Sequence, residues 1–291
     1  MSLLPNNHTR HHIPRRLRCQ PFEENHDTRF FYPSREHGLA LHKCEALVDD
    51  RVSGFAMLTG EIGCGKTMTR AVLREALERR GARVVEIENG LLDFDGLLLE
   101  LVSLINGVRA RSQTLPDRYS RLAAFKRALN ECLTDAGQHL VIVIDEAQQL
   151  GAEALEGLRS LTNLVAERSG LLSIVLVGLP PLIERIAAMP AVDSRVEYRA
   201  HLGPLGPAEL LRYLVHRMAF AGLQVSPPFT VDSLSVLHHI SGGVPREVNR
   251  ICRGALNFAV THRLLEMDAR LVHRIAADAG LGSAVPALEA T

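Results

Sequence analysis

Two short stretches of the chain hold side chains that suit chemistry on a phosphate. In GEIGCGKT, residues 60–67, three glycines are followed by a lysine and a threonine. Glycines let the backbone turn so that successive N–H groups point at a phosphate, and the lysine adds a positive charge. In LVIVIDEAQ, residues 140–148, Asp145 and Glu146 follow an apolar run. One carboxylate there can bind a metal ion while the next activates a water molecule.

The elements on either side of residues 60–67 distinguish a phosphate-binding loop from a flexible turn. Residues 54–59 form an apolar run typical of a buried strand, and residues 68–81 have helical spacing that ends at a glycine. Strand, glycine-rich loop and helix is the order that a phosphate-binding loop requires. The residues predicted to contact the nucleotide are therefore Gly60, Glu61, Ile62, Gly63, Cys64, Gly65, Lys66, Thr67 and Met68.

The lysine, the threonine and the two acids have distinct predicted roles. Lys66 can reach the β- and γ-phosphates, and the hydroxyl of Thr67 can bind Mg²⁺ together with Asp145. Glu146 can deprotonate a water molecule for attack on the γ-phosphate. The alternative is that Asp145 caps the next helix and Glu146 is a surface charge. Two acids after a buried strand favour hydrolysis over transfer to a second substrate, for which the sequence indicates no pocket.

Strands alternate with helices over residues 54–202. Apolar runs predict strands at 54–59, 82–88, 139–144, 171–178 and 195–202, and helical spacing predicts helices at 94–108, 118–135 and 152–168. This alternation predicts an α/β fold, with a parallel sheet between helices on both faces. Four helical segments then follow without strands, at 207–221, 230–240, 245–263 and 267–279. We therefore expect a basic arm, an α/β domain, a small all-helical domain and a flexible tail, at residues 1–21, 22–204, 205–280 and 281–291.

Composition narrows the class of protein. With 46% hydrophobic residues in a chain of 291, a sizeable core can be buried, and the 33 basic and 33 acidic residues predict no polyanion partner for the chain as a whole. The five cysteines are odd in number and form no CxxC pair, so neither a disulfide framework nor a zinc site is indicated. No apolar run approaches the roughly 18 residues of a membrane span. We expect a soluble, cytoplasmic protein.

The charge is uneven at the N-terminus. Residues 1–22 contain no acid and four arginines, Arg10, Arg15, Arg16 and Arg18. Such an arm can bind nucleic acid or an anionic surface. The alternative is a solvated terminus without a partner.

Several motifs taken together identify a family resemblance. They are PFEENHDTRFFYPSREH, GEIGCGKT, LVIVIDEAQQL, IVLVG, HLGPL and SGGVPREVNRICRGAL. Over roughly residues 20–280 the chain resembles the AAA+ ATPases of the ExeA/GspA type, the general secretion pathway protein A-like proteins, which are related to transposition-regulator ATPases. The resemblance implies ATP and Mg²⁺ as ligands, an α/β core with a helical lid, and a ring or filament whose nucleotide sites are shared between neighbouring subunits.

The resemblance also implies roles for two arginines. Arg246, in GGVPR, is similar to the lid arginine that contacts the γ-phosphate, and a guanidinium suits that role. Arg195, in DSRVEY, is similar to the arginine finger that reaches a neighbour's ATP, with Arg199 and Arg185 as competing candidates.

One position departs from the pattern of the relatives. Leu179 stands where they carry a glutamine that senses the γ-phosphate, and Asn163 and Gln148 are candidate replacements. Relatives often continue into a membrane segment and a peptidoglycan-binding domain, and we expect this chain to have no transmembrane segment of its own.

Three functions fit these observations. The first, which the match of the N-terminal and lid motifs favours, is an oligomeric ATP-hydrolysing motor or switch for envelope, secretion or pilus assembly, attached to the inner membrane only through a separate envelope partner. The second is a DNA-associated regulator of transposition that assembles on duplex DNA and recruits a transposase, which the basic arm favours. The third is an ATP-gated binding module with little turnover, which Leu179 favours.

Overall fold

The computed structural model describes residues 18–23, 27–88, 90–132, 139–166, 171–222 and 227–281. These residues form two compact units. An α/β unit comprises residues 35–203, and a helical unit is built from the described parts of residues 1–34 and 204–291. The basic residues up to 17 and the tail from 282 onward lie outside the described residues.

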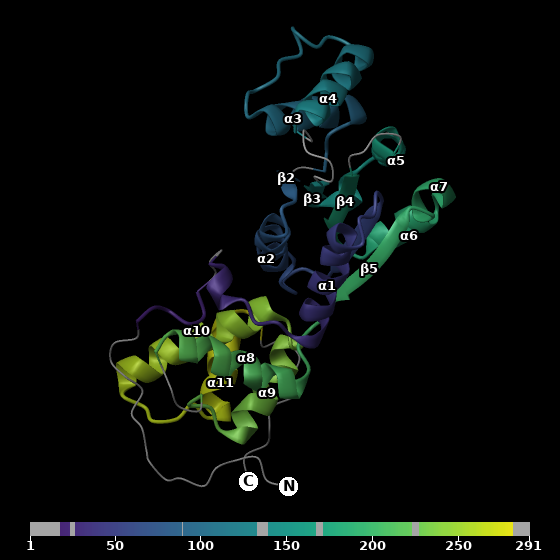
Figure 1. The fold of residues 1–291 in the computed structure, drawn as a ribbon. Coiled ribbons are helices and arrows are strands. Elements are labelled where there is room, and N and C mark those ends of the chain that lie inside the picture. Colours follow the sequence, from purple (N-terminus) through teal and green to yellow (C-terminus); the bar gives the residue numbers. More distant parts are fainter. Residues whose placement is uncertain are drawn as a thin grey trace. The chain divides into compact units, whose positions relative to one another are not determined.

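Five parallel strands form the sheet of the α/β unit (Figure 1). The strands are β1 (Phe55–Gly60), β2 (Arg83–Ile87), β3 (His139–Ile144), β4 (Leu171–Gly178) and β5 (Val196–Leu202). Their order across the sheet is β2-β3-β4-β1-β5, and all four pairings are parallel. Strands β1 and β3 are buried along their whole length, as their continuous apolar sequences predicted. The structure confirms the predicted α/β fold.

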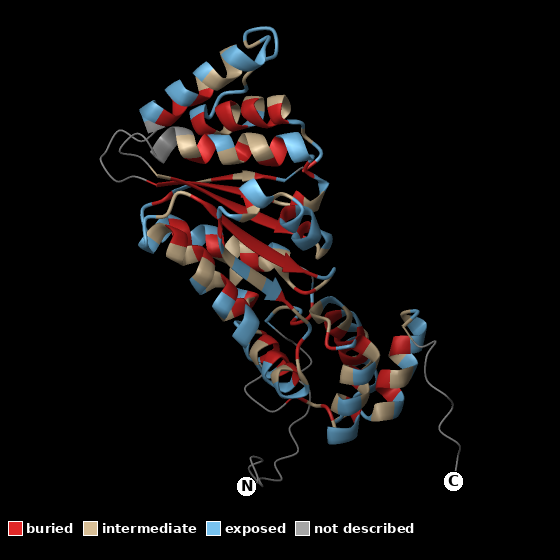
Figure 2. Cartoon of the chain, turned by 90° about the vertical axis from the view of Figure 1, so that its right-hand side faces the viewer, coloured by how far each residue is buried: buried red, intermediate tan, exposed pale blue. Residues whose placement is uncertain are grey.

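Helices cover both faces of this sheet, so that the strands lie buried between two layers (Figure 2). On one face, α1 (Arg35–Asp49) and α2 (Lys66–Arg79) pack with the strand residues Leu58 and Val141. On the other face, α3 (Phe94–Asn106) and α5 (Ala152–Ala166) pack with Met57 and Ile142, and α4 (Arg118–Cys132) packs against α3. Successive strand residues point to opposite faces, and this alternation divides the apolar side chains between the two layers.

Helix α1 was not among the predicted elements. Its buried face consists of His37, Ala40, Cys44 and Leu47, which recur at helical spacing, but the polar histidines and the glycine of the segment dilute the apolar pattern. Glu36, at the start of α1, accepts a hydrogen bond from the backbone N–H of Gly203, the last residue of the unit. The two ends of the α/β unit therefore meet.

Two short helices follow β4 on the face that α3 and α5 cover. They are α6 (Pro181–Ala187) and α7 (Pro190–Asp193), and each has a proline in its first turn, where the missing N–H costs no hydrogen bond. Leu182, Ile186 and Val192 bury these helices in the core. The chain then enters β5.

The helical unit contains four long helices among the described residues. They are α8 (Pro207–Phe220), α9 (Val231–Ser241), α10 (Pro245–His262) and α11 (Ala269–Asp278), in agreement with the segments predicted from helical spacing. Side chains such as Leu214, Ile251 and Val272 are fully buried in its core. The structure thus confirms an all-helical region after the sheet.

The N-terminal segment belongs to the helical unit, which differs from the expected domain boundary at residue 22. Phe22 and Phe30 are buried there, at 1% and 4% exposure. Arg217 of α8, itself 4% exposed, donates to the carbonyls of Pro21 and Glu23, and its guanidinium lies 4.8 Å from the centre of the Phe30 ring. A buried guanidinium must be satisfied, and these carbonyls satisfy it. The described residues between Arg18 and Ser34 therefore cluster with α8–α11.

Candidate nucleotide site

The loop between β1 and α2 has the conformation of a phosphate cradle. Gly63 and Gly65 adopt left-handed backbone angles, with φ of 86° and 91°, which glycine reaches without steric cost. Gly65 is also the N-cap of α2 and has no side chain to accept the first N–H groups of the helix. A bound phosphate would accept those hydrogen bonds and would lie at the positive end of the helix dipole.

Lys66 brings the loop and the two acids into one site. Its Nζ donates to the carbonyls of Gly60 at 2.7 Å and Glu61 at 3.0 Å. Partial burial lowers the pKa of Lys66, and the negative charges of Glu146 and Asp145 oppose that shift. The ammonium group therefore lies in the electric field of both carboxylates. These two acids follow β3, which β4 separates from β1 in the sheet.

Other residues of the predicted loop differ in their exposure. Thr67 and Glu61 are exposed, and Ile62 is 65% exposed, so its side chain leaves the cradle open. Cys64 is buried, and burial raises the pKa of its thiol. A protonated thiol is a poor nucleophile, which fits a role for Cys64 through its backbone alone.

A buried histidine supports the cradle from behind, and no role was predicted for it. His37 of α1 has its Nε2 3.0 Å from the carbonyl oxygen of Cys64. A Cβ on Gly65 would lie 2.9 Å from the same nitrogen, so a side chain there would collide with the ring. Helix α1 thus fixes the turn of the loop.

Asp145, the predicted metal ligand, already has two internal partners. Its Oδ2 accepts a hydrogen bond from Arg70 of α2 at 2.7 Å, and its Oδ1 accepts the backbone N–H of Glu146 at 2.9 Å. Arg70 is only 12% exposed and also pairs with Glu86 at 4.0 Å and with Glu88 at 3.6 Å. Arg70 was not predicted, because its partners are distant in the sequence.

The donor set fits a magnesium ion held mainly by a nucleotide. Thr67 and Asp145 offer one hydroxyl and one carboxylate, and Mg²⁺ is usually bound by one or two protein oxygens together with substrate phosphates and water. Among the described residues, no group of three or more His, Cys, Asp or Glu side chains could hold a metal by itself. A dedicated metal centre made of protein ligands alone is therefore not seen in this part of the chain.

Glu146 lies in a short turn that also contacts the end of β4. Its backbone is left-handed, with φ of 52°, and its carboxylate accepts a hydrogen bond from Gln148 of the 3₁₀ helix Ala147–Gln149. The same Gln148 accepts the backbone N–H of Leu179. The apolar residue at position 179 is thus contacted through its backbone by a glutamine from another segment.

The three candidate finger arginines have different partners. Arg195 is exposed and donates to the amide oxygen of Asn163 at 2.7 Å. Arg199 forms an ion pair with Asp193 at 2.6 Å, and Arg185 donates to the backbone carbonyl of Leu150. Asn163 is neutral, and no ion pair of Arg195 with an acid is seen among the described residues. That arrangement favours Arg195 over Arg199 for reaching an anion on a neighbour.

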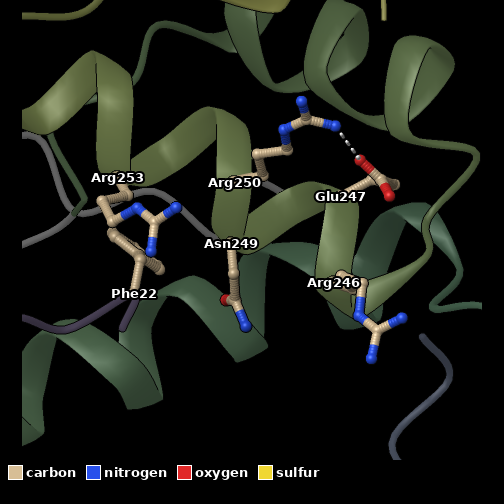
Figure 3. A pocket seen from close by; sticks show the side chains of 6 residues that line it. All are labelled: Phe22, Arg246, Glu247, Asn249, Arg250 and Arg253. Carbon is tan, nitrogen blue, oxygen red and sulfur yellow. Dashed lines mark ion pairs between the residues drawn. The ribbon is translucent and has the colours of Figure 1, made fainter. Parts of the chain in front are cut away.

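Arg246 lies in the helical unit, at the start of α10. Its side chain lines a groove of about 350 Å³ together with Phe22, Glu247, Asn249, Arg250 and Arg253 (Figure 3). The three arginines are exposed, and Arg250 pairs with Glu247 at 3.8 Å. Contact between Arg246 and a γ-phosphate stays a prediction.

Comparisons with known proteins agree with this architecture. Residues 49–186 match the family model described as AAA domain. The chain is 32% identical over 259 residues to General secretion pathway protein A of Aeromonas hydrophila, covering 86% of this chain and 46% of that protein. It is 21% identical over 250 residues to an uncharacterized HTH-type transcriptional regulator of Methanocaldococcus jannaschii, covering 75% of this chain and 61% of that protein. The chain spans less than two thirds of either relative.

Solved structures with low sequence identity share the fold. The Aeropyrum pernix ORC2 protein, in its ADPNP and ADP complexes, superposes with a TM-score of 0.62 at 18% identity over 92% of this chain and 72% of its own. Cdc6p from Pyrobaculum aerophilum superposes with a TM-score of 0.63 at 19% identity, over 87% of this chain and 70% of its own. The RuvB Holliday junction branch migration motor of Thermotoga maritima superposes with a TM-score of 0.54 at 15% identity, over 84% of this chain and 67% of its own.

A phosphate-binding loop followed by a helical region, on a sheet of this order, defines a P-loop protein of the AAA+ class. The chain belongs to the AAA+ proteins. Within that class it is similar to the ExeA/GspA type, in its motifs and in its match to General secretion pathway protein A. Within the described residues, no helix combines the length and the apolar character needed to cross a lipid bilayer.

Proposed function

We propose that this protein binds ATP with Mg²⁺, hydrolyses it, and uses the cycle as an oligomeric motor or switch. The observation that carries the proposal is the position of Lys66, in contact with the cradle and in the field of Asp145 and Glu146. A cation at the phosphates and a carboxylate that can accept a proton from water are the parts that hydrolysis needs.

Each residue then has a defined task. The N–H groups of residues 60–68 bind the phosphates, and Lys66 moves from the loop carbonyls to the β- and γ-phosphate oxygens. Thr67 and Asp145 would hold a magnesium ion, which would neutralise phosphate charge. Glu146 accepts the proton of the attacking water. Arg246 of the same subunit and Arg195 of a neighbour complete the site.

The process that we propose is assembly or operation of an envelope secretion system. The similarity to General secretion pathway protein A supports it, because that similarity covers 86% of this chain at 32% identity. The protein would act at the cytoplasmic side of the inner membrane through a separate envelope partner. A ring or filament with shared nucleotide sites is the expected assembly.

The rate of phosphate release at increasing protein concentrations tests the proposal. A specific rate that rises with concentration is expected, because each site needs an arginine from a neighbour. Glu146→Gln should bind ATP without turnover and should accumulate assemblies on a sizing column. A wild-type protein that binds no adenine nucleotide in the presence of Mg²⁺ would refute the proposal.

A second candidate function, assembly on duplex DNA, is favoured by the groove on α10. Arg246, Arg250 and Arg253 repeat at helical spacing and line the same groove, where Glu247 is the one acid among the described lining residues. Guanidinium groups bind phosphate in a bidentate way. Among proteins with this fold, the Aeropyrum pernix ORC1 protein was solved in complex with DNA, and RuvB of Thermotoga maritima is a Holliday junction branch migration motor.

Salt-dependent binding of a labelled duplex separates the two candidates. On the DNA hypothesis, Arg250→Ala with Arg253→Ala should weaken binding and reduce the slope of log K against log salt by about 1 for each arginine. Arg270→Ala, which removes an exposed arginine of α11 outside the groove, is the matched control. Wild-type protein that binds no duplex with ATP present would leave the secretion role as the better candidate.

A further inference from the structure

Gln148 lies between Glu146 and the end of β4 and contacts both. Its Nε2 donates to Oε2 of Glu146 at 2.6 Å, and its Oε1 accepts the backbone N–H of Leu179 at 3.0 Å. A carboxylate can only accept and a backbone N–H can only donate, so these two contacts fix which end of the amide is nitrogen. The side chain is therefore held at both ends in one orientation.

Two glycines next to this bridge leave space for it because they carry no side chains. A Cβ on Gly178 would lie 2.6 Å from Oε1 of Gln148, and a Cβ on Gly90 would lie 2.4 Å from the carbonyl oxygen of Glu146. Either position would clash if it carried a side chain. Glu146 itself has a left-handed backbone, which costs free energy for a residue other than glycine and persists where neighbours hold it in place.

We infer that Gln148 is a positioning residue for Glu146, and that it takes over the task of a polar side chain missing at position 179. Its N–H group holds the carboxylate at the place from which it accepts the proton of water. Its carbonyl ties that place to the end of β4, so a shift of residues 178–179 moves Glu146 as well. The inference rests on the proposed hydrolysis of ATP by Glu146.

Two substitutions at residue 148 test the bridge by kinetics. Gln148→Ala removes both contacts, and Gln148→Glu keeps the shape of the side chain but replaces the N–H donor with a second negative charge. Both should lower kcat by about 10- to 100-fold, as loss of a supporting hydrogen bond around an active group typically does. The KM for ATP should stay within about twofold, because the cradle is untouched. Gln149→Ala, at the exposed neighbouring residue, is the matched control and should keep the wild-type kcat.

A compensating substitution separates positioning from a structural role. In the Gln148→Ala background, Leu179→Gln returns an amide to the end of β4 and should recover part of the lost kcat. A residue that only stabilised the fold would not be replaced in this way. No recovery, together with a lower midpoint of urea denaturation for Gln148→Ala, would overturn the positioning role.

Hydrogen exchange gives a readout that does not depend on turnover. In the nucleotide-free protein the amide of Leu179 is bonded to Gln148, so its exchange should be slow in the wild type and faster in Gln148→Ala. Equal exchange in both proteins would refute the bridge. If the wild type binds ATP without hydrolysing it, the proposed function fails and the inference fails with it. If the wild type hydrolyses ATP and Gln148→Ala keeps its kcat, the inference alone fails.

Discussion

Arg70 and Asp145 form an ion pair of 2.7 Å that joins the first turns of α2 to the end of β3. The pair brings a positive charge to the carboxylate that is predicted to hold Mg²⁺. Two further acids, Glu86 and Glu88, lie within 4.0 Å of the same guanidinium. Arg70 therefore contacts three carboxylates beside the cradle, of which Glu86 also pairs with Arg74 at 3.7 Å. A metal ion would compete with Arg70 for Asp145.

Removal of that arginine should both destabilise the protein and favour the metal. Arg70→Met leaves partly buried carboxylates without their partner, and we expect the free energy of unfolding to fall by about 3 kcal/mol. The Mg²⁺ concentration for half-maximal turnover should also fall, since Asp145 is released. Urea denaturation and magnesium titration measure the two effects.

Arg74→Met is the control for that experiment. Arg74 lies one turn further along α2, is 50% exposed, and pairs with Glu78 at 2.9 Å and more distantly with Glu86 at 3.7 Å, but not with Asp145. An exposed pair of this kind contributes at most about 0.5 kcal/mol. A similar loss of stability in both variants would contradict the importance of the Asp145 contact.

Nucleotide affinity should depend on Lys66. Lys66→Ala removes the ammonium group from the loop, and loss of charge-assisted contacts to phosphate should weaken ATP binding by about 100-fold. Titration with a fluorescent ATP analogue measures this. Lys43→Ala, which removes a half-buried lysine of α1 that donates to the carbonyl of Arg199, should bind as the wild type does. Unchanged binding by Lys66→Ala would mean that the phosphates bind elsewhere.

Turnover by the assembly should depend on Arg195 of a neighbouring subunit. Arg195→Ala should retain ATP binding and lose about 1000-fold or more in kcat, the range known for arginine fingers. Arg199→Ala should lose little, because Arg199 is engaged with Asp193. Mixing Arg195→Ala with Glu146→Gln should restore part of the activity, since an intact glutamate then meets an intact arginine across an interface. Mixtures as inactive as the separate proteins would argue against a finger at this position.

Stability should fall in mild acid because of His139, at the start of β3. Burial lowers its pKa from 6.5 to about 4, and the charge of Arg51 adds to the shift. Ser173 donates to the carbonyl of Val52, so Nε2 of His139 must donate to Ser173. Nδ1 then has no hydrogen-bond partner among the described residues. A proton added there would be buried without an acceptor.

The direction of the pH effect follows from that shift. Between the two pKa values the unfolded chain binds a proton at His139 and the folded protein does not. The free energy of unfolding is therefore at its full value above about pH 6.5 and falls by up to about 3 kcal/mol as the pH approaches 4. Urea denaturation at several pH values measures the loss, and His139→Asn, which cannot titrate, should show a smaller one. Equal losses in both proteins would assign the effect to other groups.

The sequence predicted elements well where one local pattern decides the structure. The apolar runs of β3 and β4 gave their bounds to the residue, because strands buried on both faces leave little ambiguity. Helix α1 was missed because only three apolar side chains mark its buried face. The placement of residues 18–34 was missed because it depends on Arg217, which is nearly 200 positions away from Pro21.

The site was predictable as far as its motifs extend. Glycines, lysine and acids at fixed spacing identified the cradle and the two carboxylates, although their roles stay predictions. Arg70 and His37 carry no such signal, because each is defined by a partner that folding brings from another element. Gln148 could be suspected from the apolar residue at position 179, but its two contacts required coordinates.

The hydrogen bond between Glu36 and Gly203 has a practical consequence for dissecting the molecule. Residues 35–203 form one uninterrupted stretch whose termini are tethered to each other, so this portion suits recombinant expression in isolation and circular permutation. The helical unit, in contrast, is made from two separate stretches of the sequence, one before residue 35 and one after residue 203. A fragment starting at Pro204 would lack Phe22 and Phe30, and would expose to solvent the apolar surface that those two rings cover.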